Sequence, residues 1–372
     1  MEYRKIEKLN VAPSLLGFGC MRFPLNEDKT IDREKSQEML DYAISKGLNY
    51  IDTAYPYHDR ESEPFLGEAL AKYNRTDYFL ATKLPIWLIE KPEDVRKYFD
   101  EQCSKLKTDY IDFYLIHALN RDRWDIVKRN KVLPMLEELR NEGKIRFIGF
   151  SFHDEYPVYE EIINHRDWDF CQIQLNYVDT QIQQGMKGYE LAKEKNIPII
   201  IMEPVKGGAL ASLPGEMTHV LQAERPEWSI PSWAFRYIGS FDNVKVVLSG
   251  MSNMEQVKEN IKTYTDYQPL NDSEMAALEK VTTIYRSRQM NECTTCGYCM
   301  PCPYGVNIPK NFQLWNKGAI YEDVEGSKND YHQLEDKRKA SNCQACGACE
   351  PKCPQGIKII HDLDVIAKTY LK

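Results

Sequence analysis

Eight of the eleven cysteines in this 372-residue chain lie in two short runs near its C-terminal end. The first run, CTTCGYCMPCP, contains Cys293, Cys296, Cys299 and Cys302. The second run, CQACGACEPKCP, contains Cys343, Cys346, Cys349 and Cys353. Cysteines spaced two residues apart, with a last cysteine that precedes proline, are typical of a loop that binds a [4Fe–4S] cluster. The two runs therefore predict two clusters and the transfer of single electrons.

In proteins with two such clusters, the fourth cysteine of each run ligates the other cluster. We therefore expect one cluster to be bound by Cys293, Cys296, Cys299 and Cys353. The other cluster is then expected on Cys343, Cys346, Cys349 and Cys302. The first run departs from the pattern, because two residues rather than three precede its last cysteine. This departure affects the placement of Cys302 more than the existence of the cluster.

Zinc sites and disulfides are the competing interpretations of the cysteine runs. Tetrahedral zinc sites usually combine two C-x2–4-C pairs across a longer loop, whereas here a third cysteine follows the second after only two residues. Disulfides are disfavoured because no signal peptide precedes the start, MEYRKIEKLN, which predicts a reduced, cytoplasmic setting. The other three cysteines are isolated and are expected to be small buried hydrophobes: Cys20, Cys103 and Cys171.

A second group of reactive residues lies at the ends of successive apolar segments: Asp52, Lys83 and His117, with Tyr57 shortly after Asp52. A tyrosine with a pKa of about 10 is a poor general acid at neutral pH unless its phenolate is stabilised. The Lys83 ammonium provides that stabilisation, and Asp52 holds the ammonium in place. His117 can donate a hydrogen bond to a carbonyl oxygen as negative charge develops there. The four residues together predict the reduction of a carbonyl group.

The elements that must position these residues alternate between short apolar segments and helical patterns over residues 1–285. The apolar segments resemble strands buried on both faces, and they lie at 15–19, 48–52, 78–83, 110–117, 146–151, 169–174, 197–202 and 244–250. Helical patterns separate them, for example at 33–47 and 254–264. This alternation predicts a (β/α)8 barrel, in which chemistry occurs at the C-terminal ends of the strands. An open doubly wound sheet is the rival, but no G-x-G-x-x-G follows the first strand.

The cysteine runs are accompanied by helices rather than strands. A helical segment at 281–289 leads into the first run, and 359–370 follows the second. Between the runs, the sequence predicts helices at 309–324 and 330–341 joined by a loop at 325–329. These features predict a small, mainly α-helical ferredoxin-like domain.

Length and charge set the remaining bounds. A chain of 372 residues exceeds one ordinary core, so we expect two domains, at 1–285 and 286–372. The net charge of −8, with acidic and basic residues interspersed, argues against a nucleic-acid partner. The longest apolar stretch, 197–202, is far too short to span a bilayer. A cytoplasmic enzyme with a small-molecule substrate is expected.

Residues 1–285 resemble the aldo-keto reductase family. The resemblance lies in the segments GLNYIDTAYPY, ATKL, DFYLIH, GKIRFIGFS, CQIQLNY and GMSNMEQVKEN. It implies a (β/α)8 barrel that reduces aldehydes and ketones with a nicotinamide cofactor. It also implies a catalytic tetrad of Asp52, Tyr57, Lys83 and His117, with Tyr57 rather than Tyr55 as the catalytic tyrosine. The whole chain resembles a subgroup in which a two-cluster ferredoxin-type domain follows the barrel.

The resemblance also implies a cofactor site. The candidate cofactor-binding residues are Gly19, Met21, Arg22, Ser151, Gln172, Met202, Lys206, Gly207, Gly250, Gln256 and Asn260. Two positions depart from the family pattern, since Phe152 replaces an asparagine and Met202 replaces an aromatic residue. Gly250 and Gln256 are uncharged where NADPH-specific members place Lys or Arg for the 2′-phosphate. NADP and NAD therefore both remain open.

The two halves of the chain pose a mechanistic question, because nicotinamide transfers a hydride whereas each cluster transfers one electron. We expect NAD(P)H-linked reduction of an aldehyde or ketone, or the reverse, with the clusters relaying electrons to or from a partner such as a small ferredoxin. One alternative is a reductase whose clusters feed single electrons to the substrate, with weak or no nicotinamide binding. Another is a non-enzymatic electron carrier or redox sensor, which the intact tetrad argues against.

Overall fold

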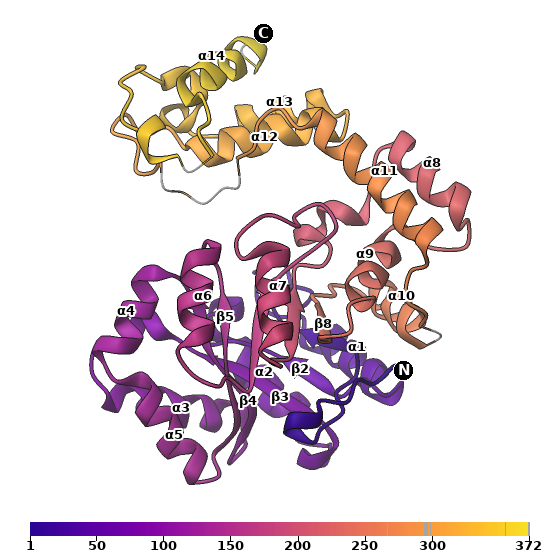
Figure 1. The fold of residues 1–372 in the computed structure, drawn as a ribbon, viewed down its shortest axis with the longest axis vertical. Helices are drawn as coiled ribbons and strands as arrows, with labels where there is room; N and C mark the ends of the chain where they lie inside the picture. Colours follow the sequence, from indigo (N-terminus) through magenta and orange to yellow (C-terminus); the bar gives the residue numbers. More distant parts are fainter. Residues whose placement is uncertain (266, 294–296, 298, 354, 371–372) are drawn as a thin grey trace. The chain divides into compact units, whose positions relative to one another are not determined.

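The computed structural model describes residues 1–265, 267–293, 297, 299–353 and 355–370 (Figure 1). These residues form two compact units. The first unit comprises Met1–Ala211 and Ser229–Asn271, and the second comprises Ser212–Trp228 and Asp272–Lys372. The expected division of the sequence into domains at 1–285 and 286–372 stays a prediction.

Among the described residues of the first unit, eight strands close into a parallel barrel in the order β1 to β8. The strands are β1 (Leu16–Gly19), β2 (Tyr50–Asp52), β3 (Phe79–Leu84), β4 (Ile111–Leu119), β5 (Ile145–Phe152), β6 (Phe170–Gln174), β7 (Ile199–Met202) and β8 (Val244–Ser249). Pairing of β1 with β8, with Leu16 opposite Val247, closes the barrel. The predicted (β/α)8 barrel is confirmed, and every predicted strand overlaps an observed one.

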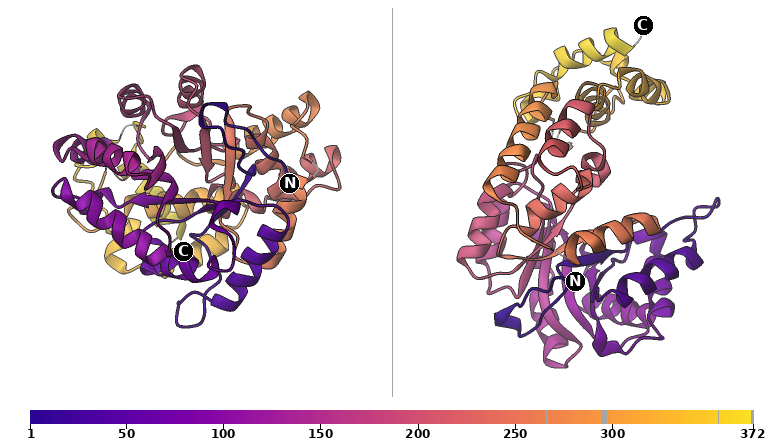
Figure 2. Two further views of the ribbon diagram at one scale, coloured as in Figure 1. Left: turned by 90° about the horizontal axis from the view of Figure 1, so that it is seen from below. Right: turned by 90° about the vertical axis from the view of Figure 1, so that its right-hand side faces the viewer.

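Helices surround the strands of the first unit (Figure 2). They are α1 (Arg33–Ser45), α2 (Ser62–Ala69), α3 (Glu93–Leu106), α4 (Arg121–Arg129), α5 (Val132–Asn141), α6 (Tyr156–Asn164), α7 (Gly185–Glu194), α9 (Ile230–Gly239) and α10 (Met254–Thr265). Side chains cap the starts of several of them: Asp32 accepts a hydrogen bond from the Lys35 amide, Asn120 accepts one from the Arg123 amide, and Asn253 accepts one from the Gln256 amide. Such caps satisfy amides that have no partner within the helix.

Aromatic side chains fill the interior of the barrel below the strand ends. The Phe113 ring packs edge-on against Tyr50 and Phe170, with ring centres 5.1 and 5.0 Å apart. Because alternate residues of a strand face the same side, Tyr50 lies below Asp52, the last residue of β2. The interior is therefore a packed core, and side chains at the strand ends stand on a rigid floor.

The second unit is helical. Its main helices are α8 (Gly215–Glu224), α11 (Asp272–Arg288), α12 (Ile308–Ile320), α13 (Val324–His332) and α14 (Ile359–Tyr370). Helix α8 lies beside α11 (Figure 1), where Arg288 forms an ion pair with Glu216 at 2.5 Å. Phe312, Tyr331 and Leu363 belong to a separate hydrophobic core that also contacts the cysteine runs. The predicted helical region after the barrel is confirmed.

The predicted loop at 325–329 is wrong, because these residues form most of α13. The Asp323 carboxylate caps this helix by accepting a hydrogen bond from the Gly326 amide at 2.9 Å. Ser327 and Tyr331, four residues apart, are buried on one face of the helix. The helix predicted at 330–341 ends at His332, and short 3₁₀ turns follow at Asp336–Arg338 and Ala340–Asn342. The cap at Asp323 and the burial of Ser327 and Tyr331 thus stabilise a helix despite the polar composition of residues 325–329.

Candidate active site and cysteine-lined cavities

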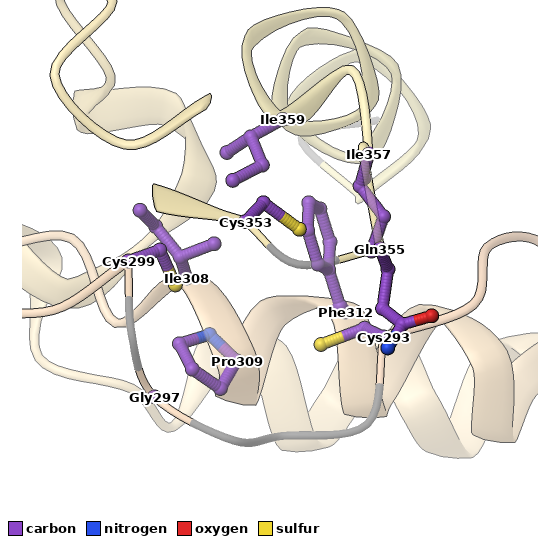
Figure 3. A pocket seen from close by; sticks show the side chains of 10 residues that line it. All are labelled: Cys293, Gly297, Cys299, Ile308, Pro309, Phe312, Cys353, Gln355, Ile357 and Ile359. Atoms are coloured by element: carbon purple, nitrogen blue, oxygen red, sulfur yellow. The ribbon is translucent and has the colours of Figure 1, made fainter. Parts of the chain in front are cut away.

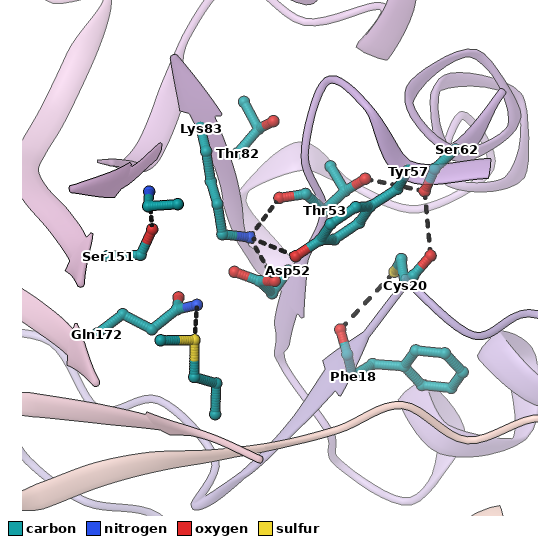
Figure 4. Close-up of polar contacts among 12 residues, drawn as sticks. Phe18, Cys20, Asp52, Thr53, Tyr57, Ser62, Thr82, Lys83, Ser151 and Gln172 are labelled. Atoms are coloured by element: carbon teal, nitrogen blue, oxygen red, sulfur yellow. Dashed lines mark hydrogen bonds and ion pairs between the residues drawn. The ribbon is translucent and has the colours of Figure 1, made fainter. Parts of the chain in front are cut away.

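Asp52, Lys83 and Tyr57 meet at the C-terminal ends of β2 and β3 (Figure 4). Lys83 is almost completely buried, and its Nζ donates hydrogen bonds to Asp52 Oδ1 and to the Thr53 carbonyl, both at 2.7 Å. The same nitrogen donates to Tyr57 Oη at 3.4 Å. The ammonium therefore links a buried carboxylate to the phenol oxygen of Tyr57.

Burial and charge together set the protonation of this group. Burial raises the pKa of the Tyr57 phenol, although the Lys83 ammonium opposes this effect. Burial disfavours the charged form of Lys83, but Asp52 and Tyr57 outweigh it and raise the pKa of Lys83. Tyr57 thus keeps its proton at neutral pH beside a cation that stabilises the phenolate whenever the proton leaves.

His117 lies near the end of β4, next to Tyr57. The two rings are nearly perpendicular, with centres 6.3 Å apart. Burial lowers the pKa of His117 well below its usual value, and the nearby cations Lys83 and Arg123 lower it further. His117 is therefore a neutral imidazole at neutral pH. Its Nδ1 atom is buried without a hydrogen-bond partner in the described part of the chain.

A buried polar network lies behind Lys83, and sequence reasoning missed it. The Glu63 carboxylate accepts hydrogen bonds from Thr82 Oγ1 at 2.7 Å and from Gln102 Nε2 at 2.5 Å. Gln102 also donates to the Lys83 carbonyl at 3.1 Å. Burial raises the pKa of Glu63. One signal was available in the sequence, because Glu63 precedes Leu66 by three residues and Leu70 by seven and so lies on the apolar face of α2.

This network makes a stability prediction. We expect Glu63→Ala to lower the free energy of unfolding by about 2–4 kcal/mol, because it leaves the buried Thr82 hydroxyl without its acceptor, removes one acceptor of Gln102 and creates a cavity. Glu63→Gln should retain most of the stability, since its amide oxygen can accept the same hydrogen bonds. Thermal unfolding followed by circular dichroism measures the difference. Equal stability of the alanine variant and the wild type would contradict the structural role of the network.

Ser151 is the next-to-last residue of β5, Met202 is the last residue of β7, and Gln172 lies in the middle of β6. Ser151 Oγ accepts a hydrogen bond from the Ala118 amide at 2.6 Å, and Gln172 Nε2 donates to Met202 Sδ at 3.7 Å (Figure 4). Gln172 Oε1 is buried and has no partner among the described residues. Phe152 is fully buried against Tyr159 and offers no polar atom at this strand end.

Two glycines leave room for the Arg22 side chain on the other side of the barrel mouth. A Cβ atom on Gly250 would lie 3.1 Å from Arg22 Cδ, and one on Gly207 would lie 3.7 Å from Arg22 Nη2. In the described ranges, no carboxylate lies within ion-pairing distance of Arg22, which is exposed. Gly19 packs near the Ser249 carbonyl. The Met21 side chain is largely exposed.

The remaining candidate residues of the cofactor site are engaged within the protein. Lys206 forms an ion pair with Asp179. Gln256 Oε1 accepts a hydrogen bond from the Ser252 amide at 2.8 Å. Asn260 is buried and donates to Ser249 Oγ at 2.9 Å.

The cysteines of the second unit line two cavities in the described part of the chain. Cys293, Cys299 and Cys353 line the first cavity together with Phe312 and Ile308 (Figure 3). The second cavity is lined by Cys299, Cys302, Cys343, Cys346 and Cys349. The fourth cysteine of each run therefore lines the cavity formed with the other run. Cys296 lies outside the described residues.

None of the ten described cysteines forms a disulfide with another, and this includes Cys20, Cys103 and Cys171. Cys20 and Cys171 are fully buried, as expected from the sequence, whereas Cys103 is partly exposed. Burial raises the pKa of Cys171 to about 12, and the thiol of this residue contacts the Tyr159 hydroxyl at 3.4 Å.

The chain belongs to the aldo/keto reductase family, whose profile matches residues 15–283. A second profile, that of a 4Fe-4S dicluster domain, matches residues 292–358. The protein is thus an aldo-keto reductase-type oxidoreductase with a C-terminal iron–sulfur domain of the ferredoxin type.

Two curated proteins and one solved structure are similar to this chain over most of their own length. The uncharacterized oxidoreductase YqkF of Bacillus subtilis is 26% identical over 323 residues, which cover 78% of this chain and all of that protein. L-galactose dehydrogenase of Arabidopsis thaliana is 25% identical over 73% of this chain and 90% of its own length. The holo form of an aldo-keto reductase from Bacillus halodurans is 26% identical with a TM-score of 0.64, covering 76% of this chain and 96% of that structure.

Within the described residues, no helix combines the length and the apolar character needed to cross a membrane.

Proposed function

We propose that this protein reduces an aldehyde or ketone with NADH or NADPH, or runs the reverse reaction, at the group formed by Asp52, Tyr57, Lys83 and His117. The observation that carries this proposal is the hydrogen bond from Lys83 to Tyr57, with Lys83 held in turn by Asp52. Such an arrangement turns a phenol into an effective proton donor. A structural ion pair alone has no need of a tyrosine hydroxyl and a neutral histidine beside it.

The protein residues act on the carbonyl oxygen. When bound, the reduced nicotinamide supplies a hydride to the carbonyl carbon. Tyr57 donates its proton to the carbonyl oxygen, and Lys83 stabilises the phenolate that remains. Neutral His117 donates a hydrogen bond to the same oxygen and stabilises the charge that develops there. The products are an alcohol and the oxidised cofactor.

The residues at the barrel mouth fit a nicotinamide nucleotide. Gln172 Oε1, which has no partner among the residues that the structure describes, suits the amide donor of a nicotinamide carboxamide, and Met202 supplies a polarisable face for a ring. Arg22, which has room beside Gly250 and Gly207, offers a cation to the phosphates. Lys206 is held by Asp179 and its charge is partly neutralised. We propose that Arg22 carries more of the phosphate binding than Lys206.

The spacing of the two cysteine runs and the match to a 4Fe-4S dicluster domain support two [4Fe–4S] clusters in the second unit. We propose Cys293, Cys296, Cys299 and Cys353 as ligands of one cluster, and Cys302, Cys343, Cys346 and Cys349 as ligands of the other. The lining of the two cavities supports this crossed arrangement. Bound clusters supply one-electron transfer, which we propose connects the enzyme to a redox protein such as a small ferredoxin.

A cluster-fed reductase with weak or no nicotinamide binding is the second candidate. It is favoured by Phe152, whose side chain packs against Tyr159 and leaves no amide at the nicotinamide end of the site.

An anaerobic titration tests the proposed link between cofactor and clusters. NADH and NADPH are added separately to the holoprotein, and cluster reduction is followed by EPR and absorbance. The same holoprotein is also assayed for carbonyl reduction, which we expect with at least one of the two cofactors. The cluster-fed alternative fails if NAD(P)H alone supports many turnovers in protein whose clusters have been removed. The proposal of NAD(P)H-linked reduction fails if neither cofactor binds or supports turnover.

A further inference from the structure

A cation that pairs with no carboxylate of the described residues lies near the proposed catalytic histidine. Arg123 is in the first turn of α4, and its Nη1 donates a hydrogen bond to the Ala118 carbonyl at 2.8 Å. The guanidinium carbon lies 5.1 Å from the centre of the Trp87 ring. Trp87 belongs to the short 3₁₀ helix Ile86–Leu88 that follows β3. Arg123 is thus fixed by one hydrogen bond and one ring contact.

The charge of Arg123 is not neutralised by the protein. Throughout the described ranges, no carboxylate lies within ion-pairing distance of this guanidinium, whereas Arg121 and Lys128 of the same helix both pair with Glu161. The Arg123 side chain is only partly buried. Partial burial lowers the pKa of Arg123.

Arg123 and His117 share one wall of the barrel mouth. The Trp87 ring centre lies 5.2 Å from that of His117. The Arg123 guanidinium also contacts the Trp87 ring, so Trp87 contacts both residues. Arg123 also lowers the pKa of His117 and of His153. His153, with a pKa lowered to about 4 mainly by desolvation, is neutral at pH 7. Lys83 is paired with Asp52, which leaves Arg123 as an unpaired cation on this side of the proposed site.

We propose that the substrate is a carbonyl compound that carries a carboxylate, and that Arg123 determines this specificity. The inference rests on the proposed function, since it assumes that the carbonyl group is bound by Tyr57 and His117. A substrate bound there extends along the Trp87 ring toward Arg123. A guanidinium presents parallel N–H groups that match a planar carboxylate, and such charge-assisted pairs are stronger than neutral hydrogen bonds.

Matched aldehydes test this specificity. The probes are benzaldehyde, 4-carboxybenzaldehyde, its neutral amide 4-formylbenzamide, and 4-formylphenyl phosphate, each assayed with the holoprotein. We expect kcat/KM for 4-carboxybenzaldehyde to exceed that for 4-formylbenzamide by about 10- to 100-fold, mainly through a lower KM. Arg123→Gln should remove this preference, so that 4-carboxybenzaldehyde and 4-formylbenzamide have similar kcat/KM values. Arg123→Lys should restore part of it, because the charge remains while the planar fork is lost.

Arg129→Gln is the matched control, because Arg129 is an exposed arginine at the other end of α4. It should leave the carboxylate preference unchanged. The inference is overturned if wild-type protein reduces the carboxylate and the amide equally well, or if Arg123→Gln keeps the preference. A larger Arg123-dependent preference for the phosphate would overturn the assignment to a carboxylate. If the wild type reduces none of these aldehydes, the proposed function itself fails, which is a separate outcome.

Discussion

Replacement of Tyr57 by phenylalanine is expected to lower kcat/KM for carbonyl reduction by about 10³-fold or more. The variant removes the hydroxyl that accepts a hydrogen bond from Lys83 at 3.4 Å and that donates the proton in the proposed mechanism. A positioned general acid contributes about 10²- to 10⁴-fold, and loss of hydrogen bonding to the developing alkoxide adds to the effect. Steady-state kinetics with NADH and NADPH measure this loss.

The tyrosine at position 55 provides the matched control. Tyr55 is buried against Tyr98, with ring centres 5.6 Å apart, and Arg60 lies over its ring. Tyr55→Phe removes the same atom two residues away and should keep most of the activity. The [4Fe–4S] clusters of both variants should remain reducible by dithionite, because the substitutions lie in the first unit. Retention of full activity by Tyr57→Phe would show that the barrel uses another proton donor.

Replacement of the fourth cysteine of either run should remove the cluster of the other run. We expect Cys353→Ser to lose the cluster bound by the first run and Cys302→Ser to lose the cluster bound by the second, with iron content falling by about half. The physical reason is that Cys353 lines a cavity with Cys293 and Cys299, whereas Cys302 lines one with the second run. EPR spectra of the reduced variants identify which cluster remains.

Double variants make this test sharper. If the arrangement is crossed, Cys293→Ser combined with Cys353→Ser should keep one cluster, while Cys293→Ser combined with Cys302→Ser should lose both. The opposite pattern would contradict the crossed assignment. Cys103→Ser is the control, because Cys103 lies in α3 of the first unit, and it should retain both clusters.

The barrel could be predicted from the sequence because its strands are short, apolar and regularly separated by helical patterns. Each segment is buried on both faces, so its composition differs clearly from that of the surrounding helices. The meeting of Asp52, Tyr57 and Lys83 followed from the same reasoning, since strand ends converge at one end of a parallel barrel. Their hydrogen bonds agree with the predicted chemistry, and their catalytic roles stay a prediction.

Other features depend on contacts between elements that the sequence does not display. The sequence places Glu63 on the apolar face of α2, but only the folded structure shows that Thr82 of β3 and Gln102 of α3 donate hydrogen bonds to its Oε1 atom. Arg123 resembles a surface arginine until Trp87 and His117 are placed beside it. The helix α13 was missed because its cap at Asp323 and its buried Ser327 matter more than the local polarity.

In the proposed reaction a hydride passes directly to a carbonyl carbon bound at Tyr57 and His117. The origin of the hydrogen on the alcohol carbon therefore distinguishes this reaction from single-electron reduction. NADH or NADPH labelled with deuterium at C4 is used to reduce 4-carboxybenzaldehyde in ordinary water, and the alcohol product is examined by mass spectrometry and NMR. Direct hydride transfer predicts one deuterium on the alcohol carbon when the label occupies the transferred position. We expect this result both in wild-type protein with intact clusters and in protein from which the clusters have been removed. If instead the product carries no deuterium, whichever face of the cofactor is labelled, its carbon-bound hydrogen comes from water. That result would rule out direct hydride transfer and support single-electron reduction through the clusters.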